Sequence, residues 1–427
     1  MVKKGYKQTE VGVIPEDWEL LLLGKTAKVY RGGSPRPIQS YITNSSNGVN
    51  WIKIGDVREN DKYIYSTQEK IRPDGISMSR EVHIGDFILS NSMSFGRPYI
   101  LRTNGCIHDG WLTIQEYSQA FSTEYLYYLL SSQIIYKQYI GMAAGSSVKN
   151  LNKDKVSSLM VICPPLPEQQ RIAEALSDVD GMISSLEKLI AKYKSIKTAC
   201  LQQMFPQNGE TVPRMRLPGF TDAWEQRKLD DMCTIITKQT GFDYSATIKP
   251  ALVTVKEQDT YSFIQNKDFE GTNINLDTDF YVPISVAGKY PKITIDQPSL
   301  LISISGRIGN VGLYSLDSNA FIGGAVGICK LKNIEDGKTA LYELLSPAGQ
   351  KYFSSLIKAS SHANITVEDI RDIETILPKD EDEKEKLNRY FENLDHLITL
   401  HQRKLEKIQK IKQGMMQQLL TGKIRLV

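Results

Sequence analysis

Two stretches of the chain carry apolar residues at alternating steps of four and three, the 3.5-residue spacing of a coiled-coil helix. The first stretch, within residues 167–205, aligns Ile172, Leu176, Val179, Ile183, Leu186 and Ile190. The second, within residues 379–427, aligns Leu387, Phe391, Leu394, Ile398, Leu405 and Ile408. A single helix of this kind could lie on the core of its own domain. Two copies in the same register favour a pair of helices packed on each other.

The rest of the chain has a different pattern, with short apolar runs that are typical of strands. Examples are "WIKIGDV" and "DFILSNS" in the first half, and "PISVAG" and "LLISIS" in the second. One amphipathic helix is expected to close each half, "TEYLYYLLSSQIIYKQYI" in the first and "TALYELLSPAGQKYFSSLI" in the second, with a break or bend at Pro347. The pattern predicts a mixed α/β (α+β) fold.

The two halves of the chain resemble each other. Asp180 falls on Asp395 and Ile183 on Ile398, each 215 residues later, and weaker matches extend upstream. This internal repeat predicts four parts: a domain at residues 1–166, a helix at 167–205, a similar domain at 206–378 and a C-terminal helix at 379–427.

Connectivity then predicts how the two long helices pair. The chain leaves the first helix at its C-terminal end and folds the second domain there, so a short connection sends the second helix back along the first. We therefore expect an antiparallel coiled coil and a pseudo-two-fold repeat. At about 1.5 Å per residue, such a helix is roughly 57 Å long, which exceeds the ~34–36 Å of one turn of B-DNA.

Composition restricts the class of protein without naming a partner. The 427 residues include 52 Lys and Arg against 49 Asp and Glu, so nucleic-acid binding would need local basic patches. No apolar run reaches the ~18–20 residues that span a bilayer, and the N-terminus lacks an apolar signal core. Five cysteines without CxxC pairing argue against a disulfide framework. These features predict a cytoplasmic protein without membrane association.

The motifs of the common enzymes and metal sites are not present. The single Pro-Pro pair, at residues 164–165, lies where the first long helix begins and lacks the Asn/Asp and aromatic neighbours of an amino-methyltransferase. The stretch "GRIGNVG" has the wrong spacing for a dinucleotide fingerprint, and no GxxxxGK phosphate loop occurs. The five histidines lack the spacing of metal ligands. We expect neither catalytic residues nor a metal site in this chain.

Several local motifs resemble one family over almost the whole length, the specificity (S) subunits of type I restriction–modification systems. They are "PPLPEQQRIAEALSDVD" and "KTACLQQMFPQ" around the first long helix, "LPGFTDAWEQRKL" at the start of the second half, and "IKQGMMQQLLTGKIRLV" at the end. The resemblance implies two target recognition domains that each read half of a bipartite, asymmetric double-stranded DNA site. One departure is that "LPKDEDEKEK" lacks the "PEQ" of its counterpart.

The same resemblance implies the partners and cofactors. Two methyltransferase (M) subunits that modify adenine would dock on the long helices, and restriction (R) subunits would join through the complex. This chain would bind no cofactor itself, whereas S-adenosylmethionine, ATP and Mg would belong to the partner subunits.

Candidate DNA-binding residues lie in loops between the predicted strands. Arg can read guanine, Asn and Gln can read adenine, and Ser, Lys or backbone N–H groups can hold phosphate. In the first domain the candidates are Arg31, Arg36, Ser92, Ser94, Arg97, Lys149 and Asn150. In the second they are Lys238, Gln239, Lys289, Tyr290, Arg307, Asn310, His362 and Asn364.

Two other classes of function compete with a DNA-recognition subunit. A two-headed coiled-coil scaffold for protein or glycan partners would show the same helices and domains. A DNA methyltransferase or nuclease in its own right would need the catalytic motifs that the sequence lacks.

Overall fold

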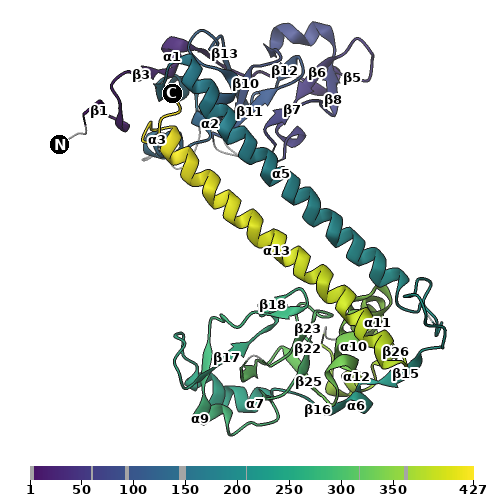
Figure 1. Cartoon of the computed structure of the whole chain (residues 1–427). Coiled ribbons are helices and arrows are strands. Elements are labelled where there is room, and N and C mark those ends of the chain that lie inside the picture. The colour runs from purple at the N-terminus through teal and green to yellow at the C-terminus, as the bar shows by residue number, and fades with distance from the viewer. Residues whose placement is uncertain are drawn as a thin grey trace. The chain divides into compact units, whose positions relative to one another are not determined.

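The computed structural model describes residues 4–58, 61–91, 96–143, 151–207, 209–316, 318–359 and 364–427. The chain forms two compact units, one of Met1–Ser185 with Lys404–Val427, the other of Leu186–Arg403. The long helices α5 (Leu166–Gln203) and α13 (Glu381–Leu419) each contribute one part to each unit (Figure 1).

Two five-stranded sheets form the body of the first unit. The first sheet has the order β4 (Lys28–Arg31), β13 (Trp111–Gln115), β10 (Phe87–Ser90), β11 (Pro98–Leu101), β7 (Tyr63–Ile64). The second has the order β5 (Ile42–Thr43), β8 (Glu69–Ile71), β6 (Val49–Ile52), β12 (Gly105–Ile107), β9 (Arg80–Val82). β10 and β11 are buried along their whole length, which explains their continuous apolar sequence, because strands covered on both faces need no polar alternation.

Two four-stranded sheets form the body of the second unit. One has the order β16 (Cys233–Lys238), β25 (Val326–Leu331), β22 (Ser299–Ser303), β23 (Val311–Tyr314). The other has the order β20 (Tyr281–Pro283), β17 (Thr260–Ile264), β24 (Ala320–Ile322), β21 (Thr294–Ile295). The order β4-β13-β10-β11 in the first unit corresponds to β16-β25-β22-β23 here, so the repeat seen in the sequence is also a repeat of topology.

A two-stranded ribbon precedes each long helix. β14 (Met160–Cys163) pairs antiparallel with β3 (Glu19–Leu22) before α5, and β26 (Glu374–Leu377) pairs in the same way with β15 (Glu225–Lys228) before α13. Smaller hairpins join β1 (Tyr6–Thr9) to β2 (Gly12–Pro15) and β18 (Phe269–Glu270) to β19 (Asn273–Ile274).

Short helices complete both units and correct one prediction. The single helix expected at "TEYLYYLLSSQIIYKQYI" is two helices, α2 (Thr123–Leu130) and α3 (Gln133–Ala143). Ser131 caps the first helix, and the Ser132 hydroxyl accepts a bond from Ile135 N at 3.5 Å, so the serine pair interrupts the backbone ladder. The break expected at Pro347 is present between α10 (Ile334–Leu345) and α11 (Pro347–Ala359). The remaining helices are α1 (Leu23–Thr26), α4 (Lys153–Ser157), α6 (Leu229–Met232), α7 (Gly241–Asp243), α8 (Lys249–Ala251), α9 (Ile284–Ala287) and α12 (Val367–Arg371).

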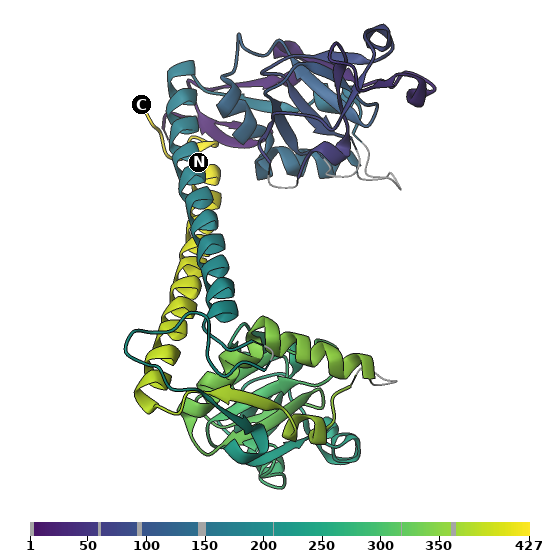
Figure 2. The ribbon, with the colours of Figure 1, turned by 90° about the vertical axis from the view of Figure 1, so that its right-hand side faces the viewer.

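The two long helices run antiparallel in each unit (Figures 1 and 2). In the first unit Lys412 pairs with Asp180 at 2.6 Å, and in the second Lys197 pairs with Asp395 at 2.5 Å. Rising numbers on α5 therefore meet falling numbers on α13. The two ion pairs are equivalent in the repeat, because both Asp180 and Asp395, and Lys197 and Lys412, are 215 residues apart. The prediction that the long helices pack together is confirmed.

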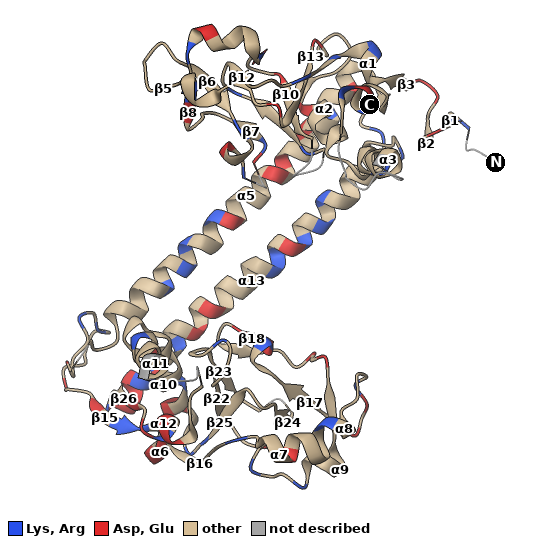
Figure 3. Ribbon diagram, turned by 180° about the vertical axis from the view of Figure 1, so that it is seen from behind, with Lys and Arg blue, Asp and Glu red and all other residues tan. Residues whose placement is uncertain are grey.

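Most residues of the predicted apolar seam are buried, and charged residues recur along both long helices (Figure 3). The buried members are Ile172, Leu176, Val179, Leu186, Ile190, Leu387, Phe391, Leu394, Ile398 and Ile408. Ile183 and Leu405 are half-buried. The outer ends of the seam also belong to the domain cores: Leu176 shares one buried cluster with Leu420, and the centroid of the Phe391 ring lies 5.7 Å from that of Phe205. Within the described residues, no helix is both long enough and apolar enough to cross a membrane.

Candidate nucleic-acid interface

In both units, loops meet at one end of the strands of the sheet that contains β10 in the first unit and β22 in the second. At this end Asn91 N donates to Gly110 O at 3.1 Å in the first unit, and Ile304 N donates to Ala325 O at 3.0 Å in the second. A second pair of equivalent bonds joins Leu151 N to Asn91 O at 2.9 Å and Ile365 N to Ile304 O at 3.0 Å. We call these regions the loop edges. The first consists of residues 31–36, 91, 108–110 and 151. The second consists of residues 238–241, 265–266, 304–310, 323–325 and 364–365.

The first loop edge brings Arg31 and Arg36 to one acidic residue. Arg31 Nε donates to Asp109 O at 3.4 Å, and Arg36 Nη2 lies 3.3 Å from Asp109 Oδ2. Ser34 Oγ donates to Asp109 Oδ1 at 3.1 Å, and His108 Nε2 lies 2.9 Å from the same oxygen. The Asp109 carboxylate is thus the common partner of Ser34, Arg36 and His108. The Arg36 side chain is 81% exposed to solvent.

Electrostatics keeps this acidic residue charged. Burial acts to raise the pKa of Asp109, but the neighbouring His108, the hydrogen bond from Ser34 and the Arg36 guanidinium together hold it below its ordinary value. An ionised Asp109 would repel DNA phosphates if it stood alone. The Arg36 guanidinium beside the carboxylate offsets this charge, while Arg31 bonds to the backbone carbonyl of Asp109.

Arg97 occupies a position equivalent to that of a residue on the second loop edge. Strand pairing of β10 with β11 and of β22 with β23 makes Pro98 equivalent to Val311, so Arg97 corresponds to Asn310. Arg97 lines a pocket together with Tyr127, Tyr128 and Lys412. This pocket lies beside the C-terminal part of α13, and Asp109 is not among its lining residues.

The second loop edge gathers five of the predicted residues. Lys238 ends β16 and Gln239 follows it. Arg307 is exposed in the turn between β22 and β23, where Asn310 N donates to Arg307 O at 3.4 Å. Asn364 forms a backbone bridge with Ser305. Two predicted residues lie elsewhere, because Lys289 and Tyr290 follow α9, and the Tyr290 ring packs on Phe321 at 6.4 Å in the core.

The remaining predicted residues lie outside the described part of the chain. They are Ser92, Ser94, Lys149, Asn150 and His362.

Sequence reasoning missed two residues at the loop edges. Asp109 organises the first edge, and Asn266 Nδ2 donates to Ser305 O at 3.0 Å in the second. For Asn266 the internal repeat offered a signal, whereas nothing in the repeat singled out Asp109. The turns Ile54–Asp56 and Asn266–Asp268 are equivalent, and in each an aspartate accepts the backbone N–H three residues earlier, from Lys53 at 2.7 Å and from Gln265 at 2.7 Å.

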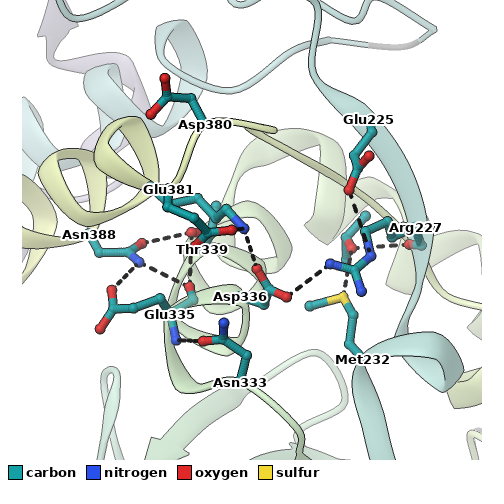
Figure 4. A network of polar contacts seen from close by, with 12 residues as sticks. Glu225, Arg227, Met232, Asn333, Glu335, Asp336, Thr339, Asp380, Glu381 and Asn388 are labelled. Carbon is teal, nitrogen blue, oxygen red and sulfur yellow. Dashed lines mark hydrogen bonds and ion pairs between the residues drawn. The ribbon is translucent and has the colours of Figure 1, made fainter.

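A network of polar contacts in the second unit joins α10 to α13 (Figure 4). Asp336 of α10 accepts from Lys384 Nζ at 2.6 Å and from Arg227 Nη1 at 2.9 Å. Asn388 of α13 accepts from Thr339 Oγ1 at 2.9 Å. These contacts join α10 to the first turns of α13 and place the Asp336 carboxylate between two cations. Within the described residues, no group of three or more His, Cys, Asp or Glu side chains could hold a metal ion.

Comparison with known proteins gives a consistent picture. Residues 15–196 and 221–410 match the family model described as the type I restriction modification DNA specificity domain. The type I restriction enzyme MjaVIII specificity subunit of Methanocaldococcus jannaschii is 24% identical over 444 residues, covering 99% of this chain and 97% of that protein.

Two solved structures share the fold. A chain from a study of complex assembly and conformational transition of the type I R-M system has a TM-score of 0.59 at 17% identity, covering 96% of this chain and 99% of that one. The S subunit of a type I restriction–modification system from M. genitalium has a TM-score of 0.57 at 13% identity, covering 94% of this chain and 96% of that one.

Proposed function

We propose, for a chain that belongs to the type I restriction modification DNA specificity family, that its two loop edges read the two halves of a bipartite, asymmetric site in double-stranded DNA. The chain is a non-catalytic subunit that supplies DNA target recognition within such a complex. The observation that carries this proposal is the occurrence of the same loop edge in both units with different side chains. Equivalent positions would meet DNA in the same way, while different residues would select different bases.

The chemistry of the two edges supports unlike half-sites. The first edge offers Arg31 and Arg36 around Asp109, and arginine pairs with the O6 and N7 acceptors of guanine. The second offers Gln239, Asn310 and Asn364, whose amides can both donate and accept, with Arg307 as its exposed cation. Lys238 and Arg307 would also neutralise phosphates.

Partner binding is proposed for the outward faces of the long helices. Met182, Leu400 and Ile411 are 50%, 49% and 48% exposed on α5 and α13. Apolar side chains exposed on a helix lose contact with water when another protein covers them, which favours binding. We assign them to two adenine methyltransferase subunits, with restriction subunits joining through the complex in the cytoplasm. S-adenosylmethionine, ATP and Mg would act in those partners.

The test is the methylation motif of the complete complex. The chain, co-expressed with its methyltransferase, should methylate adenines in a motif of two short tracts with an unread gap. Exchange of residues 1–166 for the equivalent domain of a relative should change one tract only. Insertion of one heptad in each long helix should change the gap and neither tract. Simultaneous change of both tracts after the domain exchange would contradict the proposal.

A further inference from the structure

Gln239 carries an unusual amide at the second loop edge. The side chain is 4% exposed, and its Nε2 donates to Ile322 O at 3.3 Å. Its Oε1 is buried and has no hydrogen-bond partner among the described residues. An enclosed oxygen without a donor loses its hydration and gains nothing in return, so this atom is the feature of the edge that most needs a partner.

The orientation of the amide follows from its neighbour. Ile322 presents a backbone carbonyl, which can only accept, so the NH2 group of Gln239 must face it. The oxygen is therefore the atom directed away from Ile322, and rotation of the amide by 180° would place two acceptors against each other.

A small pocket lies beside this oxygen. Its lining residues are Gln239, Thr240, Gly241, Tyr244, Phe263, Gln265 and Gly324. The Tyr244 and Phe263 rings stack at 6.4 Å to form one wall. A Cβ placed on Gly324 would lie 3.4 Å from Oε1, so glycine leaves that side of the oxygen without a side chain. The pocket suits a small hydrogen-bond donor.

The chemistry of DNA narrows the identity of the donor. Phosphate and sugar oxygens of DNA accept hydrogen bonds, as do N7, O6 and O4 of the bases. In the major groove, only the exocyclic amino groups of adenine (N6) and cytosine (N4) donate. An acceptor at this position separates adenine from guanine, or cytosine from thymine, because the wrong base opposes oxygen to oxygen.

We propose that Gln239 is a specificity-determining residue whose Oε1 accepts a hydrogen bond from the exocyclic amino group of one base in the second half-site. This inference rests on the proposed reading of DNA by the loop edges and adds the residue, the atom and the base chemistry. The base would reach Oε1 through the pocket that Thr240, Gly241 and Gly324 line. The hydrogen bond to Ile322 O keeps Oε1 directed away from Ile322.

The experiment compares the methylation motifs of complexes that contain wild-type chain, Gln239→Leu or Gln239→Met. Wild type is expected to discriminate about tenfold against the wrong base at one position, the ratio of a single good contact. Both variants should lose this discrimination. Relaxation from adenine to either purine identifies the N6 group as the donor, and relaxation from cytosine to either pyrimidine identifies N4.

A matched control is Gln297→Leu in the same unit. Gln297 Nε2 donates to Thr234 Oγ1 at 3.2 Å, beside the start of β16, whereas Gln239 follows its end. Like Gln239, Gln297 donates a hydrogen bond through its side-chain amide within the second unit. The methylation motif of the Gln297→Leu complex should equal that of wild type.

Binding to DNA that lacks the amino group gives a measurement independent of methylation. Replacement of the recognised adenine by purine, or of the recognised cytosine by 2-pyrimidinone, should weaken the wild-type complex about tenfold and leave the two variants unchanged. The inference is overturned if folded Gln239→Leu and Gln239→Met complexes keep the wild-type motif and the same sensitivity to the amino group. A wild-type preference for guanine at the position also overturns it. Absence of any methylated motif with wild-type chain would instead overturn the proposed function.

Discussion

Arg425 binds Glu168 through two hydrogen bonds, from Nε to Oε1 at 2.6 Å and from Nη2 to Oε2 at 2.8 Å. The same carboxylate accepts from Trp18 Nε1 at 2.9 Å. The second unit repeats the arrangement: Glu383 accepts from Arg216 Nε and Nη2, both at 2.7 Å, and from a tryptophan Nε1 at 3.3 Å. In each unit, the segment that follows one long helix therefore closes onto the first turn of the other.

Glu168→Gln is expected to destabilise the first unit by about 1–3 kcal/mol, because the carboxylate is only 3% exposed and its charged hydrogen bonds with Arg425 are lost. Arg425 keeps one carboxylate partner in the variant, since it also donates to Asp17 at 2.8 and 2.9 Å. Glu383→Gln should destabilise the second unit to a similar degree. Urea unfolding monitored by tryptophan fluorescence checks both values. The exposed Glu174→Gln on the same helix is the control and should change stability by less than about 0.5 kcal/mol. Equal, small effects from all three variants would show that the clusters contribute little.

The two ion pairs between the long helices should differ in strength. Asp395 and Lys197 are 18% and 15% exposed, whereas Asp180 and Lys412 are 29% and 25% exposed. Each aspartate also accepts from a tyrosine, Asp395 from Tyr342 at 3.1 Å and Asp180 from Tyr128 at 2.7 Å. Burial and the neighbouring carboxylate raise the pKa of both phenols, so they stay protonated as donors.

Double-mutant cycles with Asp→Asn and Lys→Met changes should give a coupling energy of about 1–3 kcal/mol for Lys197–Asp395 and a smaller one for Lys412–Asp180, since the latter pair is better solvated. The free energies of unfolding of the single and double variants provide the measurement. A larger coupling for the more exposed pair would contradict this order.

Arg307→Gln should weaken DNA binding by the complex and reduce its salt dependence. Arg307 is exposed on the second loop edge, and each phosphate neutralised by a cation contributes about 0.9 to the slope of log affinity against log salt. Titrations of a specific duplex at several salt concentrations measure that slope. Lys379→Gln, an exposed cation before α13, is the control. An unchanged slope with Arg307→Gln would place this side chain away from the phosphates.

The pairing of the long helices could be predicted from the sequence, because the apolar pattern that indicates it is local and occurs twice. Leu176 and Phe391 each belong to a heptad pattern, which is set by the order of neighbouring residues and can be read from the sequence directly. The contacts between Arg425 and Glu168 and between Arg216 and Glu383 could not be predicted from the sequence. Arg425 and Glu168 are 257 residues apart, and nothing near either residue marks its partner. Tyr290 is a related case, because its ring is partly buried against the core of the second unit, a contact that the polar loop around it does not indicate.

Glu343 should make the stability of the second unit depend on pH. Part of its side chain is exposed, but Oε2 is buried without a hydrogen-bond partner among the described residues. Burial raises the pKa of this carboxyl to about 8, although a backbone hydrogen bond from Ile376 opposes the shift. We therefore expect the folded protein to hold Glu343 protonated at neutral pH, whereas the unfolded chain ionises it at the ordinary value of 4.5.

The sign of the effect follows from this difference. The contribution of Glu343 to stability is fully present below about pH 4.5, decreases as the pH rises, and is lost once the pH passes about 8, by at most about 1.4 kcal/mol per pH unit. Glu343→Gln cannot ionise, so it should gain stability over wild type progressively between these pH values. Urea midpoints from pH 5 to pH 8 test this, with the exposed Glu385→Gln as the control. If Glu343→Gln and Glu385→Gln both parallel wild type across the range, the buried carboxyl is ionised in the folded unit and the expected dependence is wrong.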